Sequence, residues 1–196
     1  MESANSHSRR GQETELRNRL FRPILAGSCL LVLSARITSG ATPNEELEKA
    51  MAEGNQERFE ALLAQAGSDA KPVTTTRLVN GAAYFGREKM LDPLLAKGAD
   101  FRAVDSDGWT ALHCAALGGH PHIVARMLAM GLGVNDGIRS DGMTALALGA
   151  VRGHSDVVEL LLAHHVQGQS ALSLAASAGH GQISKLLAKS KPQERP

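Results

Sequence analysis

The feature that most restricts the fold of this chain is a sequence pattern that recurs along it. The segment TALHCAALGGHPHIVARMLAMG begins at Thr110, and a related segment, TALALGAVRGHSDVVELLLAHH, begins at Thr144. A third copy, SALSLAASAGHGQISKLLAKS, begins at Ser170, and looser copies begin at Arg77 and Glu45. A pattern that returns at a near-constant interval predicts repeated structural units that stack side by side.

Each copy has the features of two short antiparallel helices. Thr110, Thr144 and Ser170 are good N-caps for the first helix of their units. A glycine near the middle of each copy is expected to end that helix, where a left-handed residue is usually needed; these glycines are Gly86, Gly119, Gly153 and Gly179. Helices of about nine residues are marginal alone in water, so we expect the units to stack and bury a continuous core.

The segment GWTALHCAALGGHPHIV, residues 108–124, resembles the ankyrin repeat, whose unit is a turn plus two helices with a T-P-L-H-x-A pattern. Ala111 stands where the family usually has proline. The resemblance implies an all-α ankyrin-repeat solenoid of about five helix–turn–helix units. It also implies short β-turn fingers that project from one side of the stack.

The predicted repeat domain covers residues 45–190, with units near 45–72, 73–104, 105–138, 139–166 and 167–190. Residues 42–44 are expected to be a linker, and residues 191–196 a disordered tail. Charges at Glu48, Lys49, Glu57 and Arg58 make the first unit a suitable polar cap. Pro93 lies well inside a second helix and should kink or shift it. The connection before the last unit is too short for a full finger.

Residues 1–41 follow a different pattern. Arg17, Arg19 and Arg22 precede an uncharged, mostly apolar run, and small residues follow it at Ser39 and Ala41. This order predicts a secretory signal peptide that is cleaved after Ala41. As a helix the run would span only about 20 Å, less than a bilayer core of roughly 30 Å. An uncleaved membrane anchor and a disordered tail or transit sequence stay open as alternatives.

Several residues that often carry chemistry have a simpler structural interpretation here. His120, His154 and His180 each follow the helix-ending glycine of their unit, so we interpret them as structural turn residues. His113 occupies the His position of the T-P-L-H pattern, which is structural in the family. Cys114 is expected to be a buried thiol, with partial exposure left open.

The remaining sequence predicts no enzyme and no cofactor. No P-loop, paired acid–base carboxylates or nucleophile elbow is present, and no metal site is expected. The formal net charge of +1 is uninformative, and no basic stripe with interleaved aromatic residues indicates nucleic acid as a partner. A metal- or redox-responsive role for Cys114, or for His164 and His165, stays open as an alternative.

The ankyrin resemblance implies that a partner protein docks on the exposed side of the first helices and on the finger tips. The positions it selects are Tyr84, Phe85, Leu117 and Arg152 on the first helices, and Val104, Asp107, Trp109, Ile138, Asp141 and Met143 on the fingers. They include the only Trp and the only Tyr of the chain, and interface hot spots are enriched in both. Alternatively, Phe85 and Leu117 pack between repeats and Trp109 makes an intramolecular contact.

These patterns together predict a non-catalytic module that binds another protein through its concave face and finger tips. We expect a monomer that, once its signal peptide is removed, contacts no membrane. In a bacterial source, export would place it in the periplasm or outside the cell, where it could guard or scaffold an enzyme. Without a functional signal it would be cytoplasmic. A secreted effector or immunity-type binder is the alternative.

Overall fold

The structure is a computed structural model that describes residues 43–65, 72–133, 143–164 and 169–190. All of them belong to one compact unit, Ile37–Pro196. The predicted signal peptide and the C-terminal tail lie outside the described residues. The helices are α3 (Pro43–Glu53), α4 (Gln56–Gln65), α5 (Pro72–Tyr84), α6 (Glu88–Ala96), α7 (Ala111–Gly118), α8 (Pro121–Ala129), α9 (Ala145–Arg152), α10 (Ser155–Ala163), α11 (Gln169–Ser177) and α12 (Gly181–Lys189).

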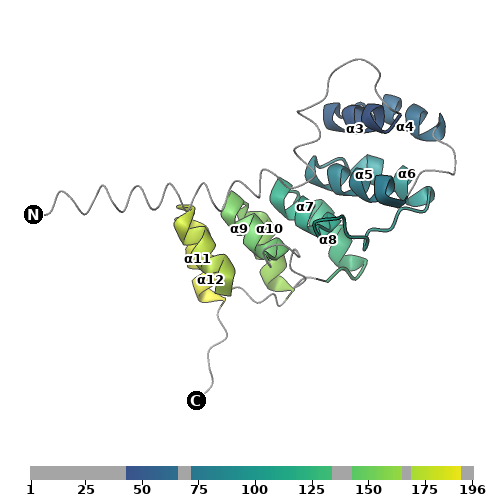
Figure 1. Cartoon of the computed structure of the whole chain (residues 1–196). Helices are drawn as coiled ribbons and strands as arrows, with labels where there is room; N and C mark the ends of the chain where they lie inside the picture. The colour runs from purple at the N-terminus through teal and green to yellow at the C-terminus, as the bar shows by residue number, and fades with distance from the viewer. Residues whose placement is uncertain (1–42, 66–71, 134–142, 165–168, 191–196) are drawn as a thin grey trace, which may run out of the picture. The chain divides into compact units, whose positions relative to one another are not determined.

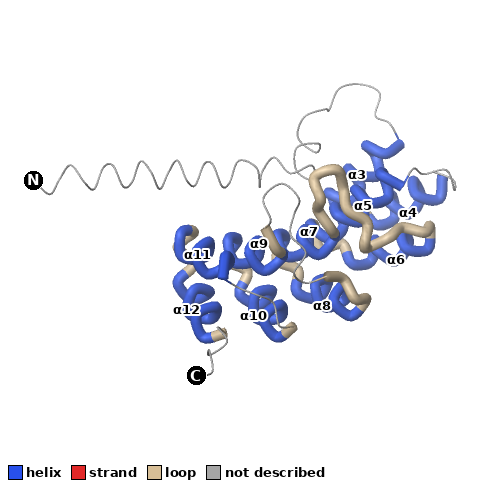
Figure 2. The backbone as a smooth tube through the Cα atoms, turned by 60° about the horizontal axis from the view of Figure 1, so that its bottom comes forward, coloured by secondary structure: helices blue, strands red, loops and turns tan. Residues whose placement is uncertain are grey.

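These helices form five pairs that stack in chain order, from α3/α4 to α11/α12 (Figure 1). The first helices of the pairs, α3, α5, α7, α9 and α11, each contact the next one in the series. The second helices form a parallel row beside them, as a turned view of the backbone shows (Figure 2). Within the described residues, β-structure is limited to a single bridge residue, Thr144. The predicted all-α ankyrin-type solenoid is therefore confirmed.

The core lies between the two rows of helices and along the first helices. Small residues allow the first helices to approach closely, as predicted: Ala82, Ala83, Ala115 and Ala116 are fully buried. The second helices bury one face only; in α8 this face consists of Ile123, Val124 and Met127. Burial of these faces by stacking supplies the stability that short helices lack on their own.

The predicted helix ends are mostly confirmed. The Thr110 side chain accepts a hydrogen bond from the His113 amide, and the Thr144 side chain accepts one from the Ala147 amide. Ser170 is not an N-cap, because α11 already begins at Gln169. The expected linker 42–44 is also too long, because α3 begins at Pro43, and proline suits the first turn of a helix.

Helix α6 continues through Pro93 from Glu88 to Ala96. Its approach to α8 is less close than that between the other neighbouring second helices. Ion pairs join the two helices instead: Arg126 pairs with Asp92, and the His122 ring lies 3.9 Å from the Glu88 carboxylate.

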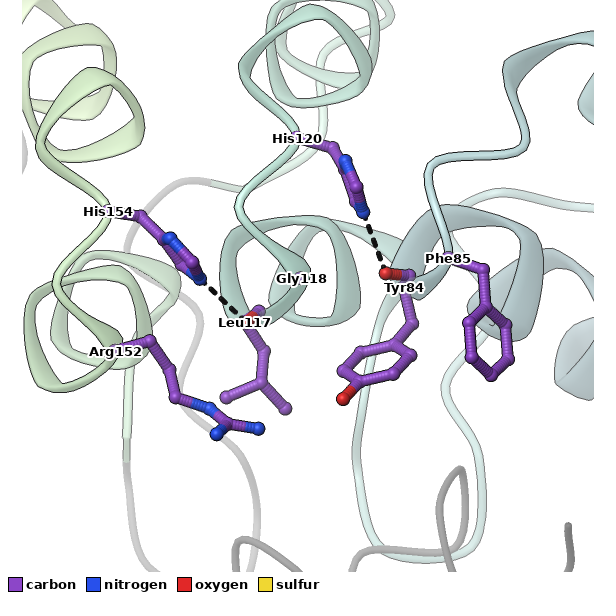
Figure 3. Close-up of a pocket in the computed structure, with 7 residues that line it drawn as sticks. All are labelled: Tyr84, Phe85, Leu117, Gly118, His120, Arg152 and His154. Carbon is purple, nitrogen blue, oxygen red and sulfur yellow. Dashed lines mark hydrogen bonds between the residues drawn. The ribbon is translucent and has the colours of Figure 1, made fainter. Parts of the chain in front are cut away.

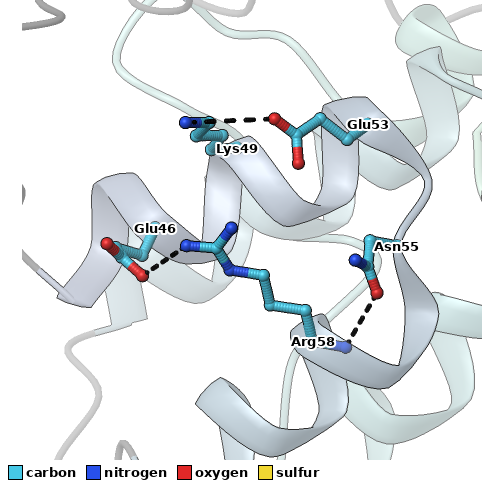
Figure 4. A network of polar contacts seen from close by, with 5 residues as sticks. All are labelled: Glu46, Lys49, Glu53, Asn55 and Arg58. Carbon is cyan, nitrogen blue, oxygen red and sulfur yellow. Dashed lines mark hydrogen bonds and ion pairs between the residues drawn. The ribbon is translucent and has the colours of Figure 1, made fainter.

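The first pair carries an exposed polar network, as expected for a cap (Figure 4). The Arg58 guanidinium lies 2.9 Å from the Glu46 carboxylate, and the Asn55 side chain accepts a hydrogen bond from the Arg58 amide. Glu48 differs from its charged neighbours because it turns inward, where it lies 3.2 Å from Arg77. Burial raises the pKa of Glu48, and the charge of Arg77 opposes this rise.

Candidate docking surface

The C-terminal ends of the first helices are joined by a ladder of histidine hydrogen bonds. Nε2 of His120 lies 2.9 Å from the Tyr84 carbonyl, and Nε2 of His154 lies 3.1 Å from the Leu117 carbonyl. His180 makes the same contact, at 2.8 Å, with the carbonyl of Val151. A carbonyl can only accept, so each ring donates from Nε2. Carbonyls at a helix end otherwise lack an intrahelical partner, so the predicted structural role of the three histidines is confirmed.

The same rings lie over the helix-ending glycines of the preceding repeat. Gly119 has a φ of +77°, in the left-handed region, and a Cβ atom there would lie 2.5 Å from the His154 ring. A Cβ atom on Gly118 would lie 2.2 Å from the Tyr84 carbonyl oxygen. These glycines are therefore required for close approach of neighbouring repeats as well as for the turn.

Burial has the largest effect on the pKa of the His120 ring. It lowers the pKa of the ring, and the hydrogen bond to the Tyr84 carbonyl opposes this effect. The nearby rings of His122 and His154 and the charge of Arg87 lower the pKa further. The ring therefore loses its proton more readily than an ordinary histidine does.

An open pocket of about 460 Å³ lies beside this ladder (Figure 3). We call it the repeat-end pocket, and its lining consists of Tyr84, Phe85, Leu117, Gly118, His120, Arg152 and His154. These residues come from the ends of α5, α7 and α9 and from the turns that follow these three helices. Three successive repeats therefore contribute to one pocket. It brings together all four binding residues predicted on the first helices.

The four side chains differ in character and extend toward the same side in Figure 3. The rings of Tyr84 and Phe85 contact each other edge to face, with centroids 5.0 Å apart, and both side chains are partly exposed. Leu117 is only 4% exposed, which favours the alternative that it packs between repeats and lines the base of the pocket. Arg152 is partly exposed and adds a cation. The pocket thus combines aromatic surface with positive charge.

The finger between α6 and α7, residues 97–110, is organised differently. The Asp105 carboxylate accepts hydrogen bonds from the amides of Asp107 and Trp109, and the Trp109 carbonyl accepts one from the Asp105 amide. Sequence reasoning missed Asp105, although an aspartate that bonds to the backbone two residues on is typical of such turns. It also missed His120 and His154 as pocket residues, because it interpreted them as turn residues only.

Trp109 does not lie open on the finger, as a docking role would require. Its side chain is only 6% exposed, and its ring contacts the His113 ring edge to face. The Asn80 side chain also donates to the Trp109 carbonyl. These contacts favour the intramolecular alternative, because the residue immediately precedes the Thr110 cap and its ring packs back onto the following helix.

The other predicted finger residues fall into three groups. Val104, with 50% exposure, and Asp107 lie on the surface, whereas Met143 is buried at 9% exposure. Ile138 and Asp141 lie outside the described residues. Helix α7, with 8 residues, separates this finger from the repeat-end pocket by about 12 Å along its axis. The predicted residues therefore divide between two ends of the first helices.

The residues considered for metal or redox chemistry are placed apart. Cys114 is 1% exposed, so the partial exposure left open for it is not found. His164 lies exposed at the end of α10, and His165 is outside the described residues. The described ranges contain no group of three or more His, Cys, Asp or Glu residues that could hold a metal ion. None of the helices described is long and apolar enough to cross a bilayer.

Comparison with known proteins adds an independent finding. Residues 79–167 match the family model described as ankyrin repeats (3 copies). Notch-regulated ankyrin repeat-containing protein A of Danio rerio is 27% identical over 99 residues, which cover 48% of this chain and 88% of that protein. Notch-regulated ankyrin repeat-containing protein of Xenopus tropicalis is 28% identical over 101 residues, with 48% and 89% coverage. Its Homo sapiens counterpart is 44% identical over 43 residues, with 22% and 38% coverage.

Proposed function

We propose that this chain, which is an ankyrin-repeat protein, binds another protein through the repeat-end pocket and has no catalytic activity of its own. Ankyrin repeats are generally protein–protein interaction modules. The relatives named above are ankyrin-repeat proteins, and their names denote no enzyme. The three relatives are vertebrate proteins, so a bacterial source finds no support among them.

The observation that carries the proposal is the composition of the repeat-end pocket. Three repeats place two partly exposed aromatic rings and one cation around a single open cavity. Tyr and Arg are among the residues that contribute most to binding energy at protein interfaces. The exposed apolar surface of Tyr84 and Phe85 gains free energy when a partner buries it, whereas Trp109 is already buried within the fold.

The test is a pull-down from extract of the source cells, in which retained proteins are measured by quantitative mass spectrometry. We compare the wild-type chain with a Tyr84→Ala, Phe85→Ala variant of the pocket and a Val104→Ser, Asp107→Asn variant of the finger. Circular dichroism first establishes that all three proteins fold. We expect one protein to be retained by the wild type and the finger variant and lost with the pocket variant. Equal retention by the pocket variant would contradict the proposal.

Two further parts of the proposal concern location and partner class. The basic, apolar and small-residue order in residues 1–41 supports export, and the N-terminus of the native protein should then be Thr42. An exported monomer of this kind would guard or scaffold an enzyme in its own compartment. A partner retained from foreign extract but not from the producer's own would instead favour an effector or immunity-type binder.

A further inference from the structure

We infer, on the premise of the proposed function, that the repeat-end pocket takes a peptide segment of the partner in which an Asp or Glu carboxylate lies next to an apolar side chain. The carboxylate would pair with Arg152, and the apolar side chain would pack on Tyr84 and Phe85. This assigns a chemical class of ligand to the pocket and a separate role to each of its parts.

Comparison of the arginines in the described ranges singles out Arg152. Three of the others form ion pairs with carboxylates, which are Arg58 with Glu46, Arg77 with Glu48, and Arg126 with Asp92. Two more donate to backbone carbonyls, which are Arg87 to Met51 and Ala52, and Arg102 to Met130. In the part of the chain that the structure describes, Arg152 has no such partner, and its Nε is buried without a hydrogen bond. A guanidinium in this position gains most from an acceptor brought by a ligand.

The surroundings of Arg152 favour an anion despite the nearby helix ends. The C-terminus of a helix carries partial negative charge on its last carbonyls, which by itself would repel a carboxylate. Here the ladder histidines donate to the carbonyls of Tyr84, Leu117 and Val151, which occupies those acceptors. None of the seven lining residues is acidic. Arg152 is the one lysine or arginine among these seven residues.

The apolar part of the pocket fits a side chain that adjoins the carboxylate. Tyr84 and Phe85 are held edge to face, so they present a fixed aromatic surface rather than two independent rings. A volume of about 460 Å³ lies within the usual range for pockets that enclose small ligands, roughly 300–1,000 Å³. The pocket is open to solvent, so a short segment of a partner's chain can enter it.

A carboxylate matches the pocket better than a phosphate group does. Recognition of phosphorylated peptides typically uses a cluster of arginines, because the phosphate carries nearly two negative charges. The repeat-end pocket offers one arginine, and its planar guanidinium suits the two oxygens of one carboxylate. We therefore expect unphosphorylated acidic segments to bind.

The experiment pans a phage-displayed library of random dodecapeptides against the full chain, and measures selected synthetic peptides by fluorescence anisotropy. We expect enriched sequences that place Asp or Glu beside Leu, Ile, Phe or Met. Arg152→Gln should weaken binding about tenfold or more, and Glu→Gln in the peptide should weaken binding to the wild type by a similar factor. The peptide change should have little further effect on Arg152→Gln, because both changes remove the same interaction.

The matched control is Arg126→Gln, which removes an arginine from the row of second helices and should leave peptide affinity unchanged. A charge-reversed pair, Arg152→Glu with Glu→Arg in the peptide, should recover part of the lost affinity. Circular dichroism establishes that each variant folds, so a loss of binding is not a loss of structure.

The contrary results separate this inference from the proposed function. If Tyr84→Ala abolishes binding but Arg152→Gln does not, the pocket binds its partner and the inferred carboxylate is wrong. If neither change alters binding, the ligand lies elsewhere, and both the inference and the proposed surface fail. Enrichment of no peptide, or binding that requires phosphoserine in place of Glu, would also overturn the inference.

Discussion

The two ends of helix α7 show how similar residue types serve different purposes. At the finger end, Trp109 is buried and its backbone is fixed by Asp105. Beside the other end, Tyr84 and Phe85 stay partly exposed, and the His120 ring donates to the Tyr84 carbonyl. At both ends polar side chains bond to the backbone, so the difference lies in the rings. Trp109 packs on the helix that follows it, whereas Tyr84 and Phe85 keep exposed surface that a partner can bury. We propose on this basis that Trp109 at the finger stabilises the fold, whereas Tyr84 and Phe85 at the pocket bind a partner.

Trp109→Ala should give the largest change. Removal of a buried tryptophan typically lowers the free energy of unfolding by about 3–5 kcal/mol, through lost transfer energy and the cavity left behind. Tyr84→Ala, at a partly exposed position, should cost about 1 kcal/mol or less. Urea unfolding followed by circular dichroism measures both. If Trp109→Ala and Tyr84→Ala lower the free energy of unfolding by similar amounts, the proposal that the finger residue stabilises the fold and the pocket residue does not is wrong.

Gly119→Ala should give the next largest change, and Gly98→Ala provides a matched control. Both glycines are left-handed, with φ of +77° and +83°, so alanine should strain each by about 1 kcal/mol. At Gly119 the new Cβ would also displace the His154 ring, whereas nothing lies within 4 Å of a Cβ at Gly98. The displaced hydrogen bond should cost about 1 kcal/mol more. Thermal or urea unfolding measures both variants. If Gly119→Ala and Gly98→Ala lower the free energy of unfolding equally, the His154 hydrogen bond does not contribute to stability.

Lower pH should reduce stability through His120, because its protonated ring carries a charge that is costly to bury. Burial lowers the pKa of this ring in the folded state, so the unfolded chain binds the proton more readily. The contribution is therefore present above the ordinary histidine pKa of about 6.5 and is lost as pH falls through the folded value. His120→Gln, whose amide can still donate to the Tyr84 carbonyl, should show a smaller loss of stability between neutral and mildly acidic pH. An identical pH profile for wild type and variant would contradict this prediction.

Arg152→Gln should give the smallest change in stability. The guanidinium has no partner in the described part of the chain, so its loss should alter the free energy of unfolding by about 0.5 kcal/mol or less. Arg77→Gln is the contrasting variant, because it would leave the inward-facing Glu48 without its pair and should destabilise more. A large loss for Arg152→Gln in urea unfolding would mean that this arginine supports the fold and is not held for a ligand.

The sequence predicts the repeat architecture well because it depends on local rules that recur in every unit. Thr110 caps helix α7 and Gly119 ends it, so both of these roles follow from position within one unit. Ser170 is not a cap, because α11 begins one residue earlier, at Gln169.

The candidate site could be predicted only in part, because its parts meet across repeats. Resemblance to the family selected Tyr84 and Arg152, but it could not show that they line one pocket with His120 and His154. Nor could it show that Trp109 turns inward, since the same finger sequence suits an exposed ring and a buried one. That choice depends on contacts with His113 and on the backbone bonds of Asp105.

Site-specific photo-crosslinking tests the central claim most directly. A photoreactive phenylalanine analogue replaces Phe85 at the pocket in one variant and Val104 on the finger in another, each produced as the full chain in the source cells. Both positions are accessible, and α7 separates them. Our account predicts that light joins one partner protein to position 85 and not to position 104. Crosslinking of the partner from position 104 alone would place the docking surface on the finger and contradict it.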